Sequence, residues 1–371
     1  MKRFLCLFIL FAGCKEAYNP HVKNAGYNYL VVEGNIIVGN DATSIHLSRT
    51  ITINDTSRSQ SETNATVTVE SDNGDTYSLE NQNNGIYSSA ALNISINKNY
   101  RVHIFTADGK EYASDFVPVK QTPPIDSVSW KYDTNNGVTI YANAHDETNN
   151  TQYYRWEFAE TWKHHAFDSS VLIYDNGSIR NRLPGEQVYG CWNVVASSET
   201  YIASTAGLSS DVVYEKPLIQ IPYGSEKISD IYSIIVYQYA LTKEGYEFWD
   251  NLKKNTETLG SIFDPQPFTE FGNIHCITDA SEPVIGFISA CSIAQQRIFI
   301  KWEQIQWPLQ SLGCMDELIS PDKVKETFAS GSLSPVGYGS NPPGSIFGDA
   351  AECVDCRLNG GGTTVKPSYM P

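Results

Sequence analysis

Apolar and polar residues alternate along much of the first third of the chain. Val67 and Val69, for example, alternate with threonines. A period of two residues is typical of half-buried β-strands. Asn73-Gly74 lies between two such segments, and this dipeptide favours the positive dihedral angles of a tight hairpin turn. The succession of about seven short strands in residues 27–120 predicts an immunoglobulin-like β-sandwich.

A pair of prolines separates this region from a second series of strands. Pro123 and Pro124 have no N–H groups to give to a central strand, so we place a domain boundary there. In residues 153–158 aromatic side chains occupy every second position, and residues 231–240 form a strongly apolar run that indicates a central strand. We therefore expect residues 125–371 to form a larger antiparallel β-domain, which makes the protein mostly β.

Two segments of this second region predict helices. Thr242 is a good N-cap for a helix over residues 243–257, in which Phe248 belongs to an apolar stripe. A shorter helix is expected over residues 320–328, with serine as its cap and proline at its first helical position.

The first 14 residues have the pattern of a lipoprotein signal peptide. Two basic residues precede an apolar run over residues 4–11, which is shorter than the roughly 20 residues of a membrane-spanning helix. Two small residues then precede Cys14. The pattern predicts removal of residues 1–13, lipidation of Cys14 and an extended tether over residues 14–26. The alternative is an ordinary signal peptide followed by a coincidental cysteine.

The chain is acidic. Its formal net charge of −16 at pH 7 would become −18 on removal of residues 1–13, which carry one lysine and one arginine. Such a charge disfavours nucleic acid and anionic membrane surfaces as partners. The acidic residues are dispersed along the chain, which favours a role in solubility.

Six of the eight cysteines remain once Cys6 is removed with the signal peptide and Cys14 is lipidated. In an exported protein pairing is the default, and spacing alone cannot select the connectivity. We expect Cys353 and Cys356 both to be in disulfides, one of which reaches Cys314 or Cys191 and fixes the glycine-rich tail. The remaining two lie within apolar strand patterns and are expected to be buried free thiols: Cys276 and Cys291.

A zinc site is the alternative role for the C-x-x-C motif of Cys353 and Cys356. It would need a second ligand pair, and the sequence contains neither a second C-x-x-C nor an H-x3–5-H motif. A redox role is disfavoured because a glycine- and asparagine-containing loop would not stabilise a thiolate as a helix start does. We therefore predict neither a metal nor a cofactor.

Two histidine-containing segments could bind a cation or act as acid and base. Both His145-Asp146-Glu147 and His164-His165 adjoin polar residues near strand ends, so we expect them in solvated loops. The sequence has no G-x-S-x-G, H-E-x-x-H or G-x-x-x-x-G-K motif. A carboxylate pair for glycoside hydrolysis stays open among the 42 acidic residues, because its geometry leaves little trace in spacing.

Several segments spread along the chain form a recognisable set. They are LVVEG (30–34), PPIDSVSW (123–130), YYRWEFAETW (153–162), the block from YSIIVYQYA to FDPQP (232–267) and CVDC (353–356) with the glycines that follow. Together these segments resemble the lipoprotein family of Bacteroidota known as domain of unknown function 4249. The similarity covers essentially the whole chain after the signal peptide, although His275, Cys276 and Cys291 depart from the usual pattern.

This resemblance implies where the protein is located and with which kind of partner it works, and it supplies no catalytic residues. Members look like companions of TonB-dependent outer-membrane transporters, and the charged Lys15-Glu16 after Cys14 resembles a weak surface-export signal. We therefore expect a lipid-anchored outer-membrane protein that faces the cell exterior and serves a TonB-dependent nutrient uptake system as a non-catalytic binding or accessory subunit. A glycan or peptide ligand stays open. The alternatives are a free-standing adhesin or scaffold and, third, a hydrolase.

Overall fold

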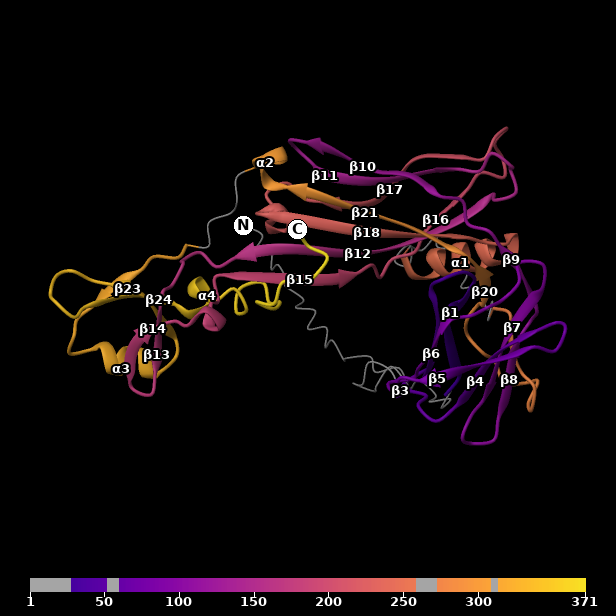
Figure 1. Ribbon diagram of the computed structural model, residues 1–371, viewed down its shortest axis with the longest axis horizontal. Coiled ribbons are helices and arrows are strands. Elements are labelled where there is room, and N and C mark those ends of the chain that lie inside the picture. The colour runs from indigo at the N-terminus through magenta and orange to yellow at the C-terminus, as the bar shows by residue number, and fades with distance from the viewer. Residues whose placement is uncertain (1–27, 52–59, 258–271, 308–312) are drawn as a thin grey trace, which may run out of the picture.

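The computed structural model describes residues 28–51, 60–257, 272–307 and 313–371. The expected signal peptide, Cys14 and the tether lie outside these ranges. The described chain forms three β-rich units, shown in Figure 1: a first unit, a central sandwich and a distal module at the opposite end from the first unit. None of the described helices is long and apolar enough to cross a membrane.

The first unit is an immunoglobulin-like β-sandwich whose sheet curls back on itself. Neighbouring strands follow the order β19-β8-β7-β4-β5-β6-β2-β1-β20-β9, and β9 also pairs with β7. The strands are β1 (Leu30–Ile37), β2 (Ala42–Arg49), β3 (Gln60–Ser61), β4 (Thr66–Ser71), β5 (Thr76–Asn81), β6 (Ile86–Ala91), β7 (Asn99–Phe105), β8 (Glu111–Ser114), β9 (Val117–Lys120), β19 (Ile274–Cys276) and β20 (Ser289–Cys291).

Two strands of this unit come from a distant part of the sequence. β20 pairs in parallel with β1 on one side and with β9 on the other, while β19 extends the sheet beside β8. Parallel neighbours need a long crossover, which here is the central sandwich itself. The predicted range of 27–120 for this unit is therefore corrected: the unit is completed by residues of the segment 272–292, which we call the return segment.

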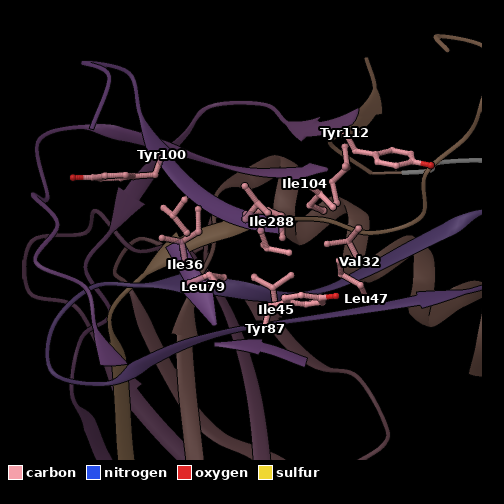
Figure 2. Packing of buried hydrophobic residues seen from close by; sticks show 14 of the residues in the cluster. Val32, Ile36, Ile45, Leu47, Leu79, Tyr87, Tyr100, Ile104, Tyr112 and Ile288 are labelled. Atoms are coloured by element: carbon pink, nitrogen blue, oxygen red, sulfur yellow. The ribbon is translucent and has the colours of Figure 1, made fainter. Parts of the chain in front are cut away.

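The return segment also contributes to the core of the first unit. Figure 2 shows Ile288 among side chains from β1, β2 and β7, and its own side chain has no exposed surface. The alternation seen in the sequence accounts for the rest of this core, because Val67 and Val69 point inward and are buried. Between β4 and β5, Gly74 adopts a φ of 90°, as the predicted hairpin turn requires.

The central sandwich packs two sheets around an aromatic-rich core. Tyr154, Trp156 and Phe158 are buried on one face of β12, as predicted. One sheet contains β10 (Ile125–Asp133), β11 (Gly137–His145) and β17 (Val212–Ile221). The other contains β15 (Gly190–Ala196), β12 (Tyr153–His165), β18 (Ile231–Ala240) and β21 (Ile293–Lys301), with β16 (Tyr201–Ser204) also paired to β12.

Helix α1 (Lys243–Glu257) occupies the predicted range and joins the central sandwich to the return segment. The N–H of Gly245 donates to Thr242 Oγ1 at 3.1 Å, so Thr242 is the cap that the sequence predicts. On the apolar stripe, Phe248 stacks on Phe287 with ring centroids 5.4 Å apart. The guanidinium of Arg155 lies 3.8 Å from the ring centroid of Trp249.

The distal module is a small unit around Leu172, Ile319, Phe328 and Ile346. Helix α3 begins at Val324 instead of Ser320, because the chain first makes a turn in which Lys323 N donates to Ser320 O. The elements are β13 (Leu172–Asp175), β14 (Ser178–Asn181), β22 (Glu317–Ile319), α3 (Val324–Ala329), β23 (Leu333–Tyr338) and β24 (Ile346–Ala350), followed by the short helix α4 (Ala351–Val354). The four-residue helices α2 (Trp302–Ile305) and α4 were not predicted.

Candidate functional site

A pocket of about 890 Å³ opens where the first unit meets the central sandwich. We call it the junction pocket. Its walls come from the turn before β7, the end of β9, the proline linker, the start of β10, the loop after β11 and one residue of the return segment. The lining residues are Ile96, Asn97, Val119, Lys120, Gln121, Thr122, Pro123, Pro124, Asp126, His145, Asp146, Glu147, Thr148, Asn150, Thr151 and Ser292.

Hydrogen bonds hold the linker side of the pocket in place. Thr122 N donates to Ser292 Oγ at 2.9 Å, and Ala240 N donates to Thr122 Oγ1 at 3.0 Å. Gln238 Nε2 donates to Pro123 O at 2.9 Å, and the Gln238 amide is itself buried in the sandwich. The prolines further restrict the backbone. The linker is therefore a fixed wall, and a preformed wall lowers the entropy that a ligand must lose on binding.

His145 lies between two carboxylates at the mouth of this pocket. Its Nδ1 is 2.8 Å from each carboxylate oxygen of Asp126, and its Nε2 is 3.8 Å from Glu147 Oε1. The hydrogen bond to Asp126, followed by the charge of that group, raises the pKa of His145. The arrangement favours the imidazolium cation, whereas a general base needs a neutral ring nitrogen directed at a nucleophile. His145 is therefore suited to hold the carboxylates of Asp126 and Glu147 in position.

A strand irregularity brings Asp126 to His145. The register of β10 against β11 shifts between Ile125 and Ser127, so Asp126 is the extra residue of a bulge. Bulges commonly redirect a side chain. Asp126 carries no local motif that marks it as a site residue, and the signal that could have identified it is the hairpin pairing of residues 125–145.

The loop after β11 is organised by Asp146. Its Oδ1 accepts from Thr148 N at 2.9 Å and Thr148 Oγ1 at 2.7 Å, while its Oδ2 accepts from Asn150 N at 3.1 Å and Thr151 N at 2.9 Å. Partial burial acts to raise the pKa of Asp146, but these hydrogen bonds outweigh it and lower the pKa to about 2. A depressed pKa stabilises the fold above the unfolded value of about 3.9, and this contribution is lost as the pH falls toward 2.

Asp146→Ala should open this loop without unfolding the protein. The amides of Thr148, Asn150 and Thr151 would lose their acceptors, so their hydrogen exchange at pH 7 should accelerate by about tenfold, equivalent to one lost hydrogen bond of about 1.4 kcal/mol. Hydrogen-exchange mass spectrometry of the 145–152 peptide measures this. Asp133→Ala is the control: Asp133 ends β10 and accepts hydrogen bonds from Asn135 N and Asn136 N in the next turn, so its loss should leave the 145–152 peptide unchanged.

The chemistry of the junction pocket is that of a polar binding site with excess negative charge. Asp126, Asp146 and Glu147 supply carboxylates, and Lys120 and His145 supply the cationic groups. Amides and hydroxyls occupy much of the remaining wall. Such a lining suits a ligand that offers hydroxyl, amide or cationic groups.

A second pocket, of about 900 Å³, lies between α1 and β19. Here His275 Nε2 is 3.1 Å from Asp115 Oδ1, and Glu244, Glu247 and Glu282 add further negative charge. The junction pocket is the stronger candidate because it combines a fixed wall with the His145-Asp146-Glu147 segment that the sequence singled out.

All four cysteines proposed for disulfides are paired. Cys191 is bonded to Cys356 and Cys314 to Cys353, so both cysteines of the C-x-x-C motif are consumed and both predicted partners are used. The zinc alternative consequently loses its two thiolates. Contrary to the loop placement expected for the motif, Cys353 lies in helix α4.

Cys276 and Cys291 are buried free thiols, as expected. Burial raises the pKa of Cys291 to about 12, which keeps it protonated at neutral pH. Such a thiol is chemically inert compared with an exposed, activated one.

His164 corrects the expectation that both histidine segments lie in solvated loops. It is within strand β12 and only 1% exposed, and its Nε2 lies 2.8 Å from Asn359 O and 3.0 Å from Cys356 O. These contacts require an N–H at Nε2 that donates to the two carbonyls. His164 therefore fixes the glycine-rich tail against the central sandwich. His145, by contrast, is exposed at the end of β11.

Comparison with known proteins identifies a family and leaves the activity open. A search of curated proteins gave no match. Among solved structures, the two fibronectin type-III domain segment from chicken tenascin is similar at 12% identity and a TM-score of 0.17, over 57% of this chain and 89% of that one. So low a TM-score adds nothing to the architecture described above. The family described as "Domain of unknown function (DUF4249)" matches residues 15–297, most of the chain, and the protein therefore belongs to the DUF4249 family.

Proposed function

We propose that this protein is a non-catalytic binding lipoprotein, an accessory subunit of a TonB-dependent uptake system, and that its ligand is held in the junction pocket. The observation that carries the binding role is His145 between Asp126 and Glu147 beside a fixed linker wall. This arrangement organises polar contacts and presents no activated nucleophile. A glycan or a peptide with a cationic group matches the hydroxyl, amide and carboxylate lining.

The proposed location follows from the N-terminal pattern. Acyl chains on Cys14 would hold the protein at the outer membrane, facing the exterior, and would raise its local concentration beside a transporter. Cys14→Ala is the direct test of the anchor: the variant should move from the membrane to the soluble fraction.

The partner is tested by affinity purification of the tagged, full-length protein from outer membranes in gentle detergent, followed by mass spectrometry. A TonB-dependent transporter in near-stoichiometric amount is the expected result. Recovery of the protein alone would contradict the accessory role and favour a free-standing adhesin or scaffold.

The pocket is tested separately with glycan and peptide arrays. Asp126→Asn combined with Glu147→Gln should weaken binding of any array component that uses the pocket by about tenfold or more, because polar partners of a ligand are lost. Glu80→Gln, on the exposed part of β5, is the control and should bind like the wild type. If the Asp126→Asn, Glu147→Gln variant binds as tightly as the Glu80→Gln control, the junction pocket is not the binding site.

A further inference from the structure

A half-buried carboxylate and a buried one meet between the central sandwich and the distal module. Asp168 follows β12, and Asp349 belongs to β24 and is only 6% exposed. The Oδ2 atom of each is shielded from solvent and receives no hydrogen from a donor among the described residues. The two side chains are close enough to share a hydrogen bond with each other if one of them carries a proton.

No cation balances this pair within the described part of the chain. The ion pairs found there include neither Asp168 nor Asp349, and the second charged group that acts on Asp168, after Asp349, is another acid, Asp316. Asp349 Oδ1 accepts a hydrogen bond from Ala350 N at 2.6 Å. Its other carboxylate oxygen, Oδ2, has no donor among the described residues. A buried, unpartnered carboxylate oxygen is strongly unfavourable unless something compensates it.

A shared proton is the alternative way to compensate the pair. Burial, followed by the hydrogen bond and charge of Asp349, raises the pKa of Asp168 to about 6. A proton would leave one negative charge on the pair, whereas a divalent cation would neutralise both carboxylates and use both shielded Oδ2 atoms as ligands.

The available ligand atoms select the type of cation. The sulfur atoms of Cys314 and Cys353 lie within 4.8 Å of an Asp349 carboxylate oxygen, but they are joined in a disulfide and are not thiolates. What remains are carboxylate oxygens. Oxygen ligands suit hard cations, and Ca²⁺ completes its shell of about six to eight ligands with water and carbonyl oxygens.

We propose that Asp168 and Asp349 form a Ca²⁺-type binding site, with Asp316 at its rim. The ion would tie two parts of the chain together: the segment that leaves β12 and strand β24. Asp168 N also donates to Cys353 O at 2.8 Å, so the site lies directly beside the Cys314–Cys353 disulfide. The site would fix the distal module to the central sandwich and is independent of the junction pocket.

The test uses the full chain after the signal peptide, with its disulfides intact, freed of divalent ions with a chelator. Titration calorimetry with CaCl₂ and with MgCl₂ should show one Ca²⁺ site, and added Ca²⁺ should raise the thermal unfolding temperature. Asp349→Asn and Asp168→Asn should each weaken Ca²⁺ binding at least about tenfold. Asp322→Asn, an exposed acid of the same module, is the matched control and should bind like the wild type.

Three results would overturn the site. The first is a wild-type chain that binds no Ca²⁺ at about 1 mM, the upper range of extracellular sites. The second is Ca²⁺ binding that survives in both aspartate variants. The third is an unfolding temperature that depends on pH near 6 and not on Ca²⁺, which would assign the pair to a shared proton. The wild-type titration decides the question even if one variant fails to fold.

Discussion

Lys227→Met should lower the free energy of unfolding of the central sandwich by about 3 kcal/mol, the range found when one partner of a buried ion pair is removed. Lys227 Nζ lies 2.8 Å from both carboxylate oxygens of Glu160, whose side chain is 4% exposed. Tyr232 donates a further hydrogen bond to Glu160 Oε1 at 2.9 Å. Without the ammonium group, the buried Glu160 side chain would lose its charged partner and keep the hydrogen bond from Tyr232.

Tryptophan fluorescence during urea denaturation measures this loss selectively. All seven tryptophans lie between residues 130 and 307, within the central sandwich and the segments packed on it, so the signal reports on that region. Lys131→Met is the matched control, because Lys131 is 58% exposed and its pair with Glu215 should contribute no more than about 1 kcal/mol. Equal effects of the two substitutions would contradict the role given to Glu160. The double variant Lys227→Met, Glu160→Gln should recover part of the loss.

Replacing Cys191 and Cys356 together by serine should destabilise the protein by about 3–5 kcal/mol. The two residues are 165 positions apart, and a disulfide that closes a longer loop removes more entropy from the unfolded chain. The second disulfide spans 39 positions, so the Cys314→Ser, Cys353→Ser variant should lose less. The loop closed by Cys314 and Cys353 lies inside the loop closed by Cys191 and Cys356. This nesting makes the expected difference in stability between the two double variants smaller.

Denaturation under non-reducing conditions compares the two disulfide variants. Trp192 follows Cys191 directly and is buried with Ile231 and Met370, so its emission should change first in the Cys191→Ser, Cys356→Ser protein. A larger loss of stability in the Cys314→Ser, Cys353→Ser variant would show that native-state packing around Cys314 outweighs loop entropy.

Patterns confined to one segment were sufficient to predict much of this fold. The alternation in residues 153–158 identified the buried face of β12, and the cap and apolar stripe identified α1. Periodicity reports which face of a strand is buried, but it does not name the partner strand. The parallel pairing of β20 with β1 joins residues some 250 positions apart, and no local signal encodes it.

The site was harder to predict for the same reason. His145 was visible as a candidate, but its partner Asp126 depends on a bulge in β10. In the sequence His164 adjoins polar residues near a strand end, whereas in the structure it is buried and its Nε2 contacts the tail carbonyls of Cys356 and Asn359. The Asp168–Asp349 pair joins residues from two units, so each carboxyl group looks ordinary in its own stretch of sequence.

The return segment also sets an order of events during synthesis. A ribosome completes the strands β1 to β9 long before it reaches Ser289–Cys291, and until then Asn35, Ile36 and Ile37 have no neighbour on one side of β1. An exposed strand edge of this kind can pair with other chains. Because contacts so distant in sequence form slowly, the amino-terminal unit should be the last to become resistant to proteolysis. A chain stopped at the proline linker should never reach that state.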